Sequence, residues 1–347
     1  MNTKQHFCLL LFVLLVLCVA RSDAQIVATV EEVSESIEEQ KPATFGSYSE
    51  RADFIHAHLA TKLDSYVRGT DMMFAGTNEV IQGPSSKFRI ATYVEFSHDS
   101  GPQIDLSPSF DASVELPNIE ERWDVFLEGS RNDELPGIDP VDREGGSQLG
   151  VRNFWDEFPL KTEVGVNVEW LPSAFVNLEI RPEWDWRYWV FYPSLRGYYD
   201  TSDGFGSIGS LGFHRWFGGE KPKSYYQYVA AVKFTEQTEG VEWEQSFRLG
   251  YVKKTLLSNW EWNWKRTVGR TDIARGWLVE ANVFGHSSGE TVMDSRRLRL
   301  IYRRPLYREW IYLEVAPGVE WERENNWNTV PNIRFGFDML FWGTSDR

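Results

Sequence analysis

The chain has 347 residues, a formal net charge of −15, a 15% aromatic share and 16 tryptophans. The acidity disfavours nucleic acid as a partner, because a surface that binds phosphates needs a basic stripe. A hydrophobic share of 42% disfavours wholesale disorder. A mean hydropathy of −0.41, without a second long apolar run, excludes a helical membrane protein. The many tryptophans therefore need another explanation.

Residues 1–24 have the three parts of a secretory signal peptide. Lys4 begins a basic segment, residues 8–20 form an apolar run, and Ser22 and Ala24 place small residues before a cleavage site. The run is short for a membrane span, and a buried N-terminal helix or a lipoprotein signal is the alternative. Both cysteines of the chain lie inside this segment. We therefore expect a mature chain without disulfides, thiolate metal sites or cysteine nucleophiles.

Residues 25–86 are predicted to form an acidic periplasmic leader. Its first part is rich in glutamate and poor in apolar side chains, which is typical of a disordered or loosely helical segment. Ile55, Leu59 and Leu63 then recur at four-residue spacing and predict a short amphipathic helix between residues 47 and 67. A partner helix is the alternative. The rest of the leader, with several glycines, is expected to be a linker.

From Lys87 to Trp342 the hydrophobic period changes to two. Near the end of this region, for example, Ile333 and Phe335 flank Arg334. Successive side chains of a strand leave opposite faces, so each such segment has one apolar face and one charged or small face. The same alternation occupies residues 88–96, 164–170, 176–181, 241–249, 297–303, 311–315 and 333–341.

The alternating segments number about 12 to 14, which allows about 18 to 21 residues for each strand and its connection, whereas a membrane-spanning strand needs roughly 9–11. Turns rich in Gly, Pro, Asn, Asp and Ser separate them. Residues 132–148 are the best candidate for a long loop. We therefore predict an all-β domain over residues 87–342, followed by a short tail.

Two all-β architectures fit this period: a soluble sandwich with an apolar core, and an outer-membrane barrel with an apolar lipid-facing surface. No helical segment interrupts the strands, and the last strand ends in Phe341 and Trp342. The polar face combines charges with glycine, which either architecture allows. Tryptophans gather near strand ends, as in the aromatic girdles of barrels. The tryptophans in question are Trp184, Trp186, Trp189, Trp260, Trp262, Trp264, Trp310, Trp321, Trp327 and Trp342. These features favour the barrel.

On these residues the chain resembles bacterial outer-membrane β-barrels from about residue 85 to residue 342. The stretch LRLIYRRPLYREWIYLEVAPGVEW at residues 298–321 is similar to the last hairpins of a family of proteobacterial outer-membrane proteins. The resemblance implies a transmembrane, up-and-down antiparallel barrel in the outer membrane of a Gram-negative bacterium. It also implies membrane lipids, lipopolysaccharide and the barrel assembly machinery as partners, and it brings no activity. The tail 343–347 departs from the family pattern, in which the aromatic residue comes last.

The alternation places charges of both signs in the barrel interior. A turn near residues 305–308 would put Arg299 opposite Glu314, and Leu300 opposite Leu313 on the outside. The charges could form a salt-bridged filling or line a water-filled channel, and a barrel of 12 to 14 strands allows both. The mixed signs disfavour strong ion selectivity. Further interior candidates are Glu179, Arg181, Glu183, Asp185, Arg187, Glu242, Glu244, Arg248, Glu261, Lys265, Arg297, Arg303, Glu320 and Glu322.

The arginines between residues 296 and 304 allow two interpretations. They could pair with glutamates of the next strand, or they could contact lipopolysaccharide phosphates at a rim of the barrel. Pairing with the glutamates is the preferred hypothesis.

Few residues suggest chemistry, and we expect no catalytic, metal-binding or cofactor-binding residues. The motifs H-E-x-x-H, G-x-S-x-G and the P-loop do not occur in the sequence. Two His-x-Ser strings are similar to the outer-membrane phospholipase family, whose histidine also needs an amide residue on the adjoining strand. The strand after the first string supplies no such amide, so polar turns are preferred. The strings are His98-Asp99-Ser100 and His286-Ser287-Ser288, and a loop cluster that could bind calcium comprises Asp133, Glu134, Asp139 and Asp142.

The sequence thus predicts an outer-membrane β-barrel with a structural or passive, porin-like permeation role, and with an open or an occluded lumen. The alternatives are an outer-membrane lipid hydrolase that uses a His-x-Ser pair and a barrel that binds a lipid or small ligand. No nucleic acid and no defined small-molecule substrate are expected.

Overall fold

The structure is a computed structural model that describes part of the chain. The described residues are 50–58, 61–62, 87–98, 102–115, 123–129, 135, 147–155, 158–168, 172–187, 189–217, 224–237, 240–255, 273–308 and 310–342. The predicted signal segment, most of the predicted long loop, Trp260, Trp262 and Trp264, and the tail lie outside them. The chain divides into two compact units, residues 1–57 and 58–347.

Residues 50–58 and 61–62 are helical and fall within the range predicted for the amphipathic helix. Among the described residues, no helix has the length and apolar character needed to cross a membrane.

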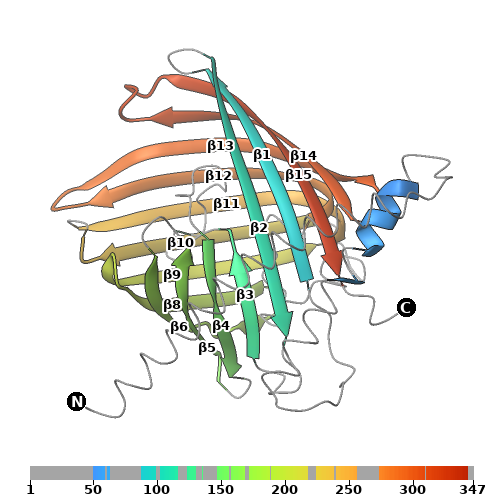
Figure 1. Cartoon of the computed structure of the whole chain (residues 1–347). Coiled ribbons are helices and arrows are strands. Elements are labelled where there is room, and N and C mark those ends of the chain that lie inside the picture. The colour runs from blue at the N-terminus through green and yellow to red at the C-terminus, as the bar shows by residue number, and fades with distance from the viewer. Residues whose placement is uncertain are drawn as a thin grey trace, which may run out of the picture. The chain divides into compact units, whose positions relative to one another are not determined.

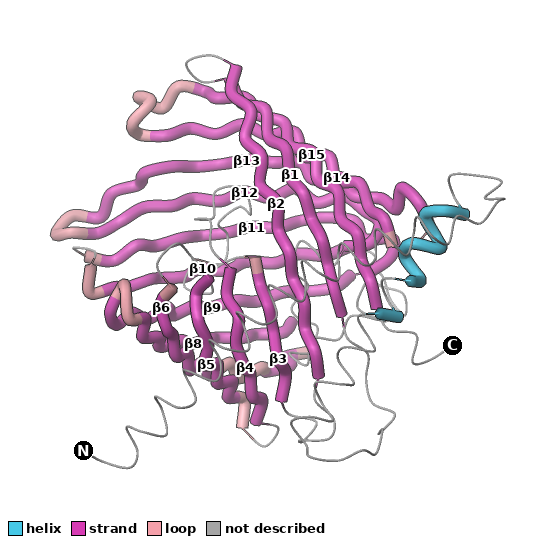
Figure 2. The backbone as a smooth tube through the Cα atoms, viewed as in Figure 1, coloured by secondary structure: helices cyan, strands magenta, loops and turns pink. Residues whose placement is uncertain are grey.

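The second unit consists of antiparallel strands (Figures 1 and 2). Apart from β6 and β7, which both pair with β8, each strand pairs with its neighbours in the chain, and β1 also pairs with β15. The strands are β1 (Lys87–His98), β2 (Pro102–Glu115), β3 (Trp123–Glu128), β4 (Ser147–Trp155), β5 (Leu160–Val168), β6 (Ser173–Ile180), β7 (Trp184–Trp186), β8 (Trp189–Asp200), β9 (Gly204–Phe217), β10 (Ser224–Thr235), β11 (Val241–Thr255), β12 (Ile273–Ser287), β13 (Thr291–Tyr307), β14 (Ile311–Glu322) and β15 (Thr329–Trp342).

Pairing between β6 and β8 closes the sheet into a barrel. The short strand β7 continues β6 in the same register against β8, since Ile180 lies opposite Leu195 and Trp184 lies opposite Phe191. Pro182 interrupts the two, because proline has no backbone N–H to give to the ladder. The closed ring therefore has 14 strands, at the upper end of the predicted range.

The two faces of the wall are inverted relative to a soluble protein. Along β13 the side chains from residue 296 to residue 304 alternate strictly between exposed and buried. Leu298, Leu300 and Tyr302 are 43%, 46% and 44% exposed, whereas Arg299 and Arg303 are 1% exposed. A sandwich would bury the leucines and expose the arginines. The prediction of an outer-membrane-type barrel, with apolar residues outside and charges inside, is confirmed.

Aromatic side chains mark both ends of the barrel. We call the end at which β1 begins the first rim and the opposite end the second rim. Exposed tryptophans near the first rim are Trp123, Trp155, Trp184, Trp186 and Trp277. Trp321 and Trp327 lie at the second rim. Trp310, which the sequence places in an exposed girdle, is instead only 8% exposed. It lies in the β13–β14 turn and packs against Tyr307 and against Phe341 of β15.

Candidate functional site: the barrel interior

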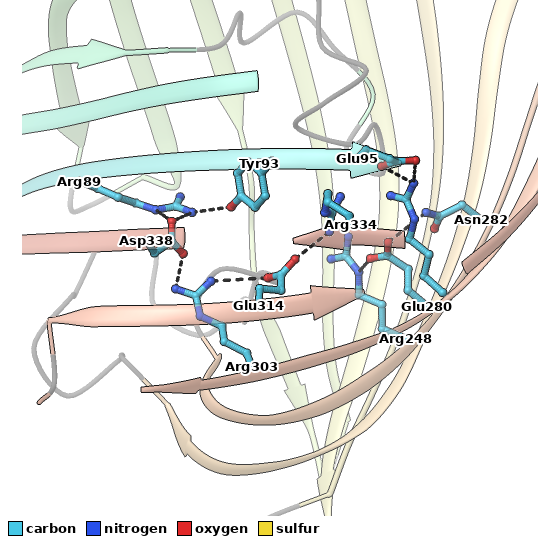
Figure 3. A network of polar contacts seen from close by, with 11 residues as sticks. Arg89, Tyr93, Glu95, Arg248, Glu280, Asn282, Arg303, Glu314, Arg334 and Asp338 are labelled. Carbon is cyan, nitrogen blue, oxygen red and sulfur yellow. Dashed lines mark hydrogen bonds and ion pairs between the residues drawn. The ribbon is translucent and has the colours of Figure 1, made fainter. Parts of the chain in front are cut away.

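Ion pairs join four strands on one side of the interior (Figure 3). Asp338 on β15 accepts hydrogen bonds of 2.8 and 3.0 Å from Arg89 on β1, and it also pairs with Arg303 on β13. Glu314 on β14 accepts a 2.7 Å bond from Arg334 and lies 3.7 Å from Arg303. Each guanidinium thus has an acidic partner on a different strand, which is how buried charges are stabilised.

Arg299 extends this network over two neighbouring strands. Its Nη2 donates to both carboxylate oxygens of Glu95 on β1, at 2.9 Å each. The side chain crosses Gly318 of β14, where an added Cβ would lie 2.5 Å from Cγ of Arg299 and 2.7 Å from Oδ1 of Asn332. Glycine is needed at this position because the arginine stem occupies the space above it.

A further group of contacts runs across the strands from β12 to β8. Arg248 on β11 donates a 2.7 Å bond to Glu280 on β12 and a 3.2 Å bond to Gln227 on β10. Gln227 in turn donates to the hydroxyl oxygen of Tyr192 at 2.7 Å. Asn282 donates a 3.3 Å bond to the second oxygen of Glu280.

A second cluster lines the wall from β4 to β8. Glu163 accepts a 2.5 Å bond from Arg152 and lies 3.2 Å from Lys161. Lys161 is also 2.9 Å from Glu179, which accepts a 2.9 Å bond from Arg196. Glu163 is fully buried, so its charge is balanced by these cations rather than by water. We call the two sets of ion pairs together the ion-pair belt. The first set consists of Arg89, Glu95, Arg248, Glu280, Arg299, Arg303, Glu314, Arg334 and Asp338, and the second of Arg152, Lys161, Glu163, Glu179 and Arg196.

Aromatic rings cover glycines on the interior face. A Cβ at Gly336 would be 2.7 Å from the ring of Tyr93 on the neighbouring strand. Gly206 under Tyr198 and Gly212 under Tyr192 are even more closely covered. The glycines of the polar face therefore make room for tyrosines, and this explains why charge and glycine alternate in the sequence.

The arginines of the ion-pair belt are largely buried. Arg299, Arg303 and Arg334 are 1%, 1% and 0% exposed. In a wide water-filled channel these guanidinium groups would be solvated. The salt-bridged filling is therefore the hypothesis that the described side chains favour. The belt contains both signs in alternation, which provides no ring of one charge for ion selection.

An apolar patch also faces the interior, on β10 to β14. It consists of Tyr225, Val252, Leu278, Ile301 and Ala316, with Trp216 packed against it. These five residues are at most 3% exposed. The patch is packed within the barrel and offers no free apolar surface to a ligand.

The predicted register of the β13–β14 hairpin was wrong by four residues. Arg303, not Arg299, lies opposite Glu314, and Leu313 lies opposite Arg304. The turn falls at residues 308–310, where Arg308 has a φ of 48°, instead of near residues 305–308. The assignment of faces was right because a shift of four residues keeps the alternation.

The other interior candidates have mixed outcomes. Arg297 pairs with Glu320 at 2.9 Å, and Glu242 lies 3.9 Å from Lys233. Arg187 is exposed in the β7–β8 turn and is not on a strand. Glu261 and Lys265 lie outside the described residues. The arginines between residues 296 and 304 fall into two groups. Arg297, Arg299 and Arg303 pair with acidic residues inside the barrel. Arg296 and Arg304 are exposed on the outer face.

Sequence reasoning did not single out Arg152, Lys161 and Glu163, or the partnership of Arg89 with Asp338. The hydrophobic alternation could have identified them as interior residues, because each occupies a polar position of a strand whose other positions are apolar or small. The partners, however, lie on strands whose pairing requires the register. Asp338 and Arg89 are 249 residues apart in the chain.

The described parts of the His-x-Ser strings form no catalytic arrangement. Nδ1 of His286 lies 2.6 Å from Oδ2 of Asp294 on β13, and Ser288 is exposed in the turn that follows β12. His98 is exposed at the end of β1, and Ser100 and the predicted calcium loop lie outside the described residues. Among the described residues, no group of three or more metal-ligating side chains is placed to hold an ion.

Comparisons with known proteins give only distant likenesses. No family model and no curated protein matches the chain. Pseudomonas aeruginosa OccK2 (OpdF) is 9% identical with a TM-score of 0.42, over 76% of this chain and 98% of that one. Pseudomonas putida OprB, in its low-pH structure, is 12% identical with a TM-score of 0.42, over 78% and 95%. A bacterial polysaccharide outer membrane secretin is 8% identical with a TM-score of 0.39, over 74% and 98%. Likenesses this distant carry no argument about function.

Proposed function

We propose that this chain is a porin-like barrel of the Gram-negative outer membrane with an occluded interior. Passage is limited to small solutes, and the remaining role is structural. The observation that carries the proposal is the inverted wall, in which exposed leucines alternate with buried arginines. An exposed apolar band suits lipid, and a buried belt of mixed charge suits a filled barrel.

We propose no enzymatic role. A lipid hydrolase would need a serine, a histidine and an orienting group within hydrogen-bond reach of one another. The contact of His286 is with Asp294, and Ser288 faces solvent. A lipid-binding interior is also disfavoured, since the interior apolar patch is already packed.

Conductance of the full chain in planar bilayers tests the occluded interior. We expect unitary steps far below those of an open porin, with nearly equal passage of cations and anions. The double variant E95A/R299A removes the contact that bridges β13 and β1, so its conductance should rise several-fold.

The double variant V94A/L298A is the matched control, because it changes the outer faces of the same two strands. Its conductance should equal that of the unmodified chain. Large, well-defined steps in the unmodified chain would contradict the occluded interior. Unchanged conductance in E95A/R299A would contradict the role of the ion-pair belt.

A further inference from the structure

One arginine of β13 points outward and is held by aromatic rings. The guanidinium carbon of Arg296 lies 5.4 Å from the ring centroid of Trp321 and 5.1 Å from that of Trp327. Trp321 is directly opposite Arg296 on β14, and Trp327 follows in the β14–β15 turn. Such distances are within the range of cation–π attraction. We call these three residues the Arg296 clamp.

Hydrogen bonds hold the two tryptophans of the clamp in place. The indole Nε1 of Trp321 donates a 2.9 Å bond to Thr329. The backbone N–H of Trp327 donates a 2.9 Å bond to the carbonyl of Glu322, and Trp327 has a φ of 60°. The Nε1 bond orients the indole ring of Trp321, and the backbone bond fixes the main chain of the turn that carries Trp327. The hairpin therefore positions both residues beside the guanidinium of Arg296.

Arg296 forms no ion pair with any residue that the structure describes, and its side chain is exposed. Two carboxylates close to the clamp in the chain are engaged elsewhere. Asp294 contacts His286 at 2.6 Å, and Glu322 accepts a 2.8 Å bond from Asn325. The arginines of the interior, by contrast, lie within reach of one or more carboxylates. The clamp therefore presents an uncompensated positive charge.

The clamp lies where the apolar band of the wall ends. On the outer face of β13, Leu298, Leu300 and Tyr302 separate Arg296 from Arg304, which is also exposed. Eight residues of strand span about 26 Å along its axis, and a tilt of 35–45° reduces this to roughly 20 Å of height, comparable with the apolar band of outer-membrane barrels. Arg296 thus marks the level at which lipid headgroups would lie.

A similar arrangement at the first rim supports this interpretation. Arg215 near the end of β9 lies 5.5 Å from the ring centroid of Trp189 and 4.5 Å from that of Phe217. Outward arginines stacked on aromatic rings therefore occur at both rims, with leucine, valine and phenylalanine exposed between them.

We propose that the Arg296 clamp binds the phosphate group of an anionic membrane lipid. The planar guanidinium can donate two parallel hydrogen bonds to phosphate oxygens, while the indole rings sit at the headgroup level beside the acyl chains. The inference rests on the proposed membrane location of the barrel, but it does not require an occluded interior. The result of the conductance measurement therefore does not decide whether the clamp binds lipid.

Native mass spectrometry of the full chain, released from detergent after incubation with lipid, tests the proposal. The unmodified chain should retain phosphatidylglycerol or lipopolysaccharide in preference to phosphatidylcholine. R296Q should retain about fivefold less anionic lipid, the loss expected of one arginine near a membrane surface. W327L, which keeps the charge and removes one ring, should also retain less.

R323Q is the matched control, because Arg323 is an exposed arginine of the neighbouring turn without a ring contact among the described residues. Its lipid retention should fall clearly less than that of R296Q, because no ring contact within the described part of the chain orients the guanidinium of Arg323. Heat-dependent gel migration shows that each variant is folded. Equal losses in R296Q and R323Q, or no preference for anionic lipid, would overturn the proposal. Displacement of the lipid by excess inorganic phosphate would assign the clamp to free phosphate instead.

Discussion

Neighbouring residues of the same type have opposite environments in this wall. Arg303 is 1% exposed and lies between Asp338 and Glu314, whereas Arg304 is exposed on the outer face. The period of two decides this difference, since successive side chains of a strand point to opposite faces. Inside, a guanidinium is tolerated only because acids on other strands neutralise it.

Replacing each of these two arginines by methionine should change the free energy of unfolding by different amounts. Arg303→Met leaves two buried carboxylates short of one cation, and we expect it to lower the free energy of unfolding by about 3 kcal/mol. Arg304→Met should change it by no more than about 0.5 kcal/mol. Urea unfolding in lipid vesicles measures both values. Equal effects of the two substitutions would contradict the assignment of faces.

Strand pairing determines which charges meet. In the β13–β14 hairpin, Leu298 lies opposite Val319 on the outer face, and this register places Arg303 beside Glu314 inside. A turn centred two residues earlier would have paired Leu300 with Leu313 without changing which face is apolar. The hydrophobic pattern permits both registers, so the turn at residues 308–310 makes the choice.

Cross-strand cysteines should distinguish the two registers. With Cys8 and Cys18 replaced by serine, L298C/V319C should form a disulfide on mild oxidation, because directly opposite Cβ atoms are about 4.5–5.5 Å apart. L300C/L313C should not, since Leu313 lies opposite Arg304, four residues and about 13 Å from Leu300. Gel mobility before and after reduction reports the bond. Efficient crosslinking of L300C/L313C would show that the observed register is wrong.

At the largest scale, the strands from β1 to β15 form a barrel whose apolar surface faces outward. Its exposed side chains include leucine, valine, phenylalanine and tryptophan on nearly every strand, and its buried side chains include arginine, lysine and glutamate. Lipid is the solvent that makes such a surface stable, because a watery exterior would favour the reverse arrangement.

The cost of an outward charge should therefore depend on its depth in the wall. Leu300→Arg lies in the middle of the apolar band and should destabilise the barrel by about 2–4 kcal/mol, whereas Leu306→Arg near the first rim should cost about 0–1 kcal/mol. Unfolding in vesicles measures both. In a protein whose outer face meets water, both substitutions would be nearly neutral, and that result would contradict the membrane location.

The sequence made the barrel predictable because hydrophobic alternation is a local property. Ile333, Phe335 and Phe337 revealed an outer face without any knowledge of neighbouring strands. The candidate site was predictable only as a set of interior charges. The partners of Arg89 and Arg299 depend on β15 and on β1, which closure of the barrel brings together from opposite ends of the domain. Even a correct list of interior residues therefore leaves their partners undetermined.

The sequence alone determined the strand period, the inverted faces, an interior of mixed charge and the aromatic strand ends. All of these follow from the residue type at alternate positions. Only the tertiary structure decided the 14-strand ring, the register that pairs Arg303 with Glu314, and the tyrosines that lie over glycines. It also separated Arg296, held by two tryptophans outside, from the arginines buried inside. Contacts across a sheet depend on which strands pair and in what register, and turn geometry and barrel closure settle both.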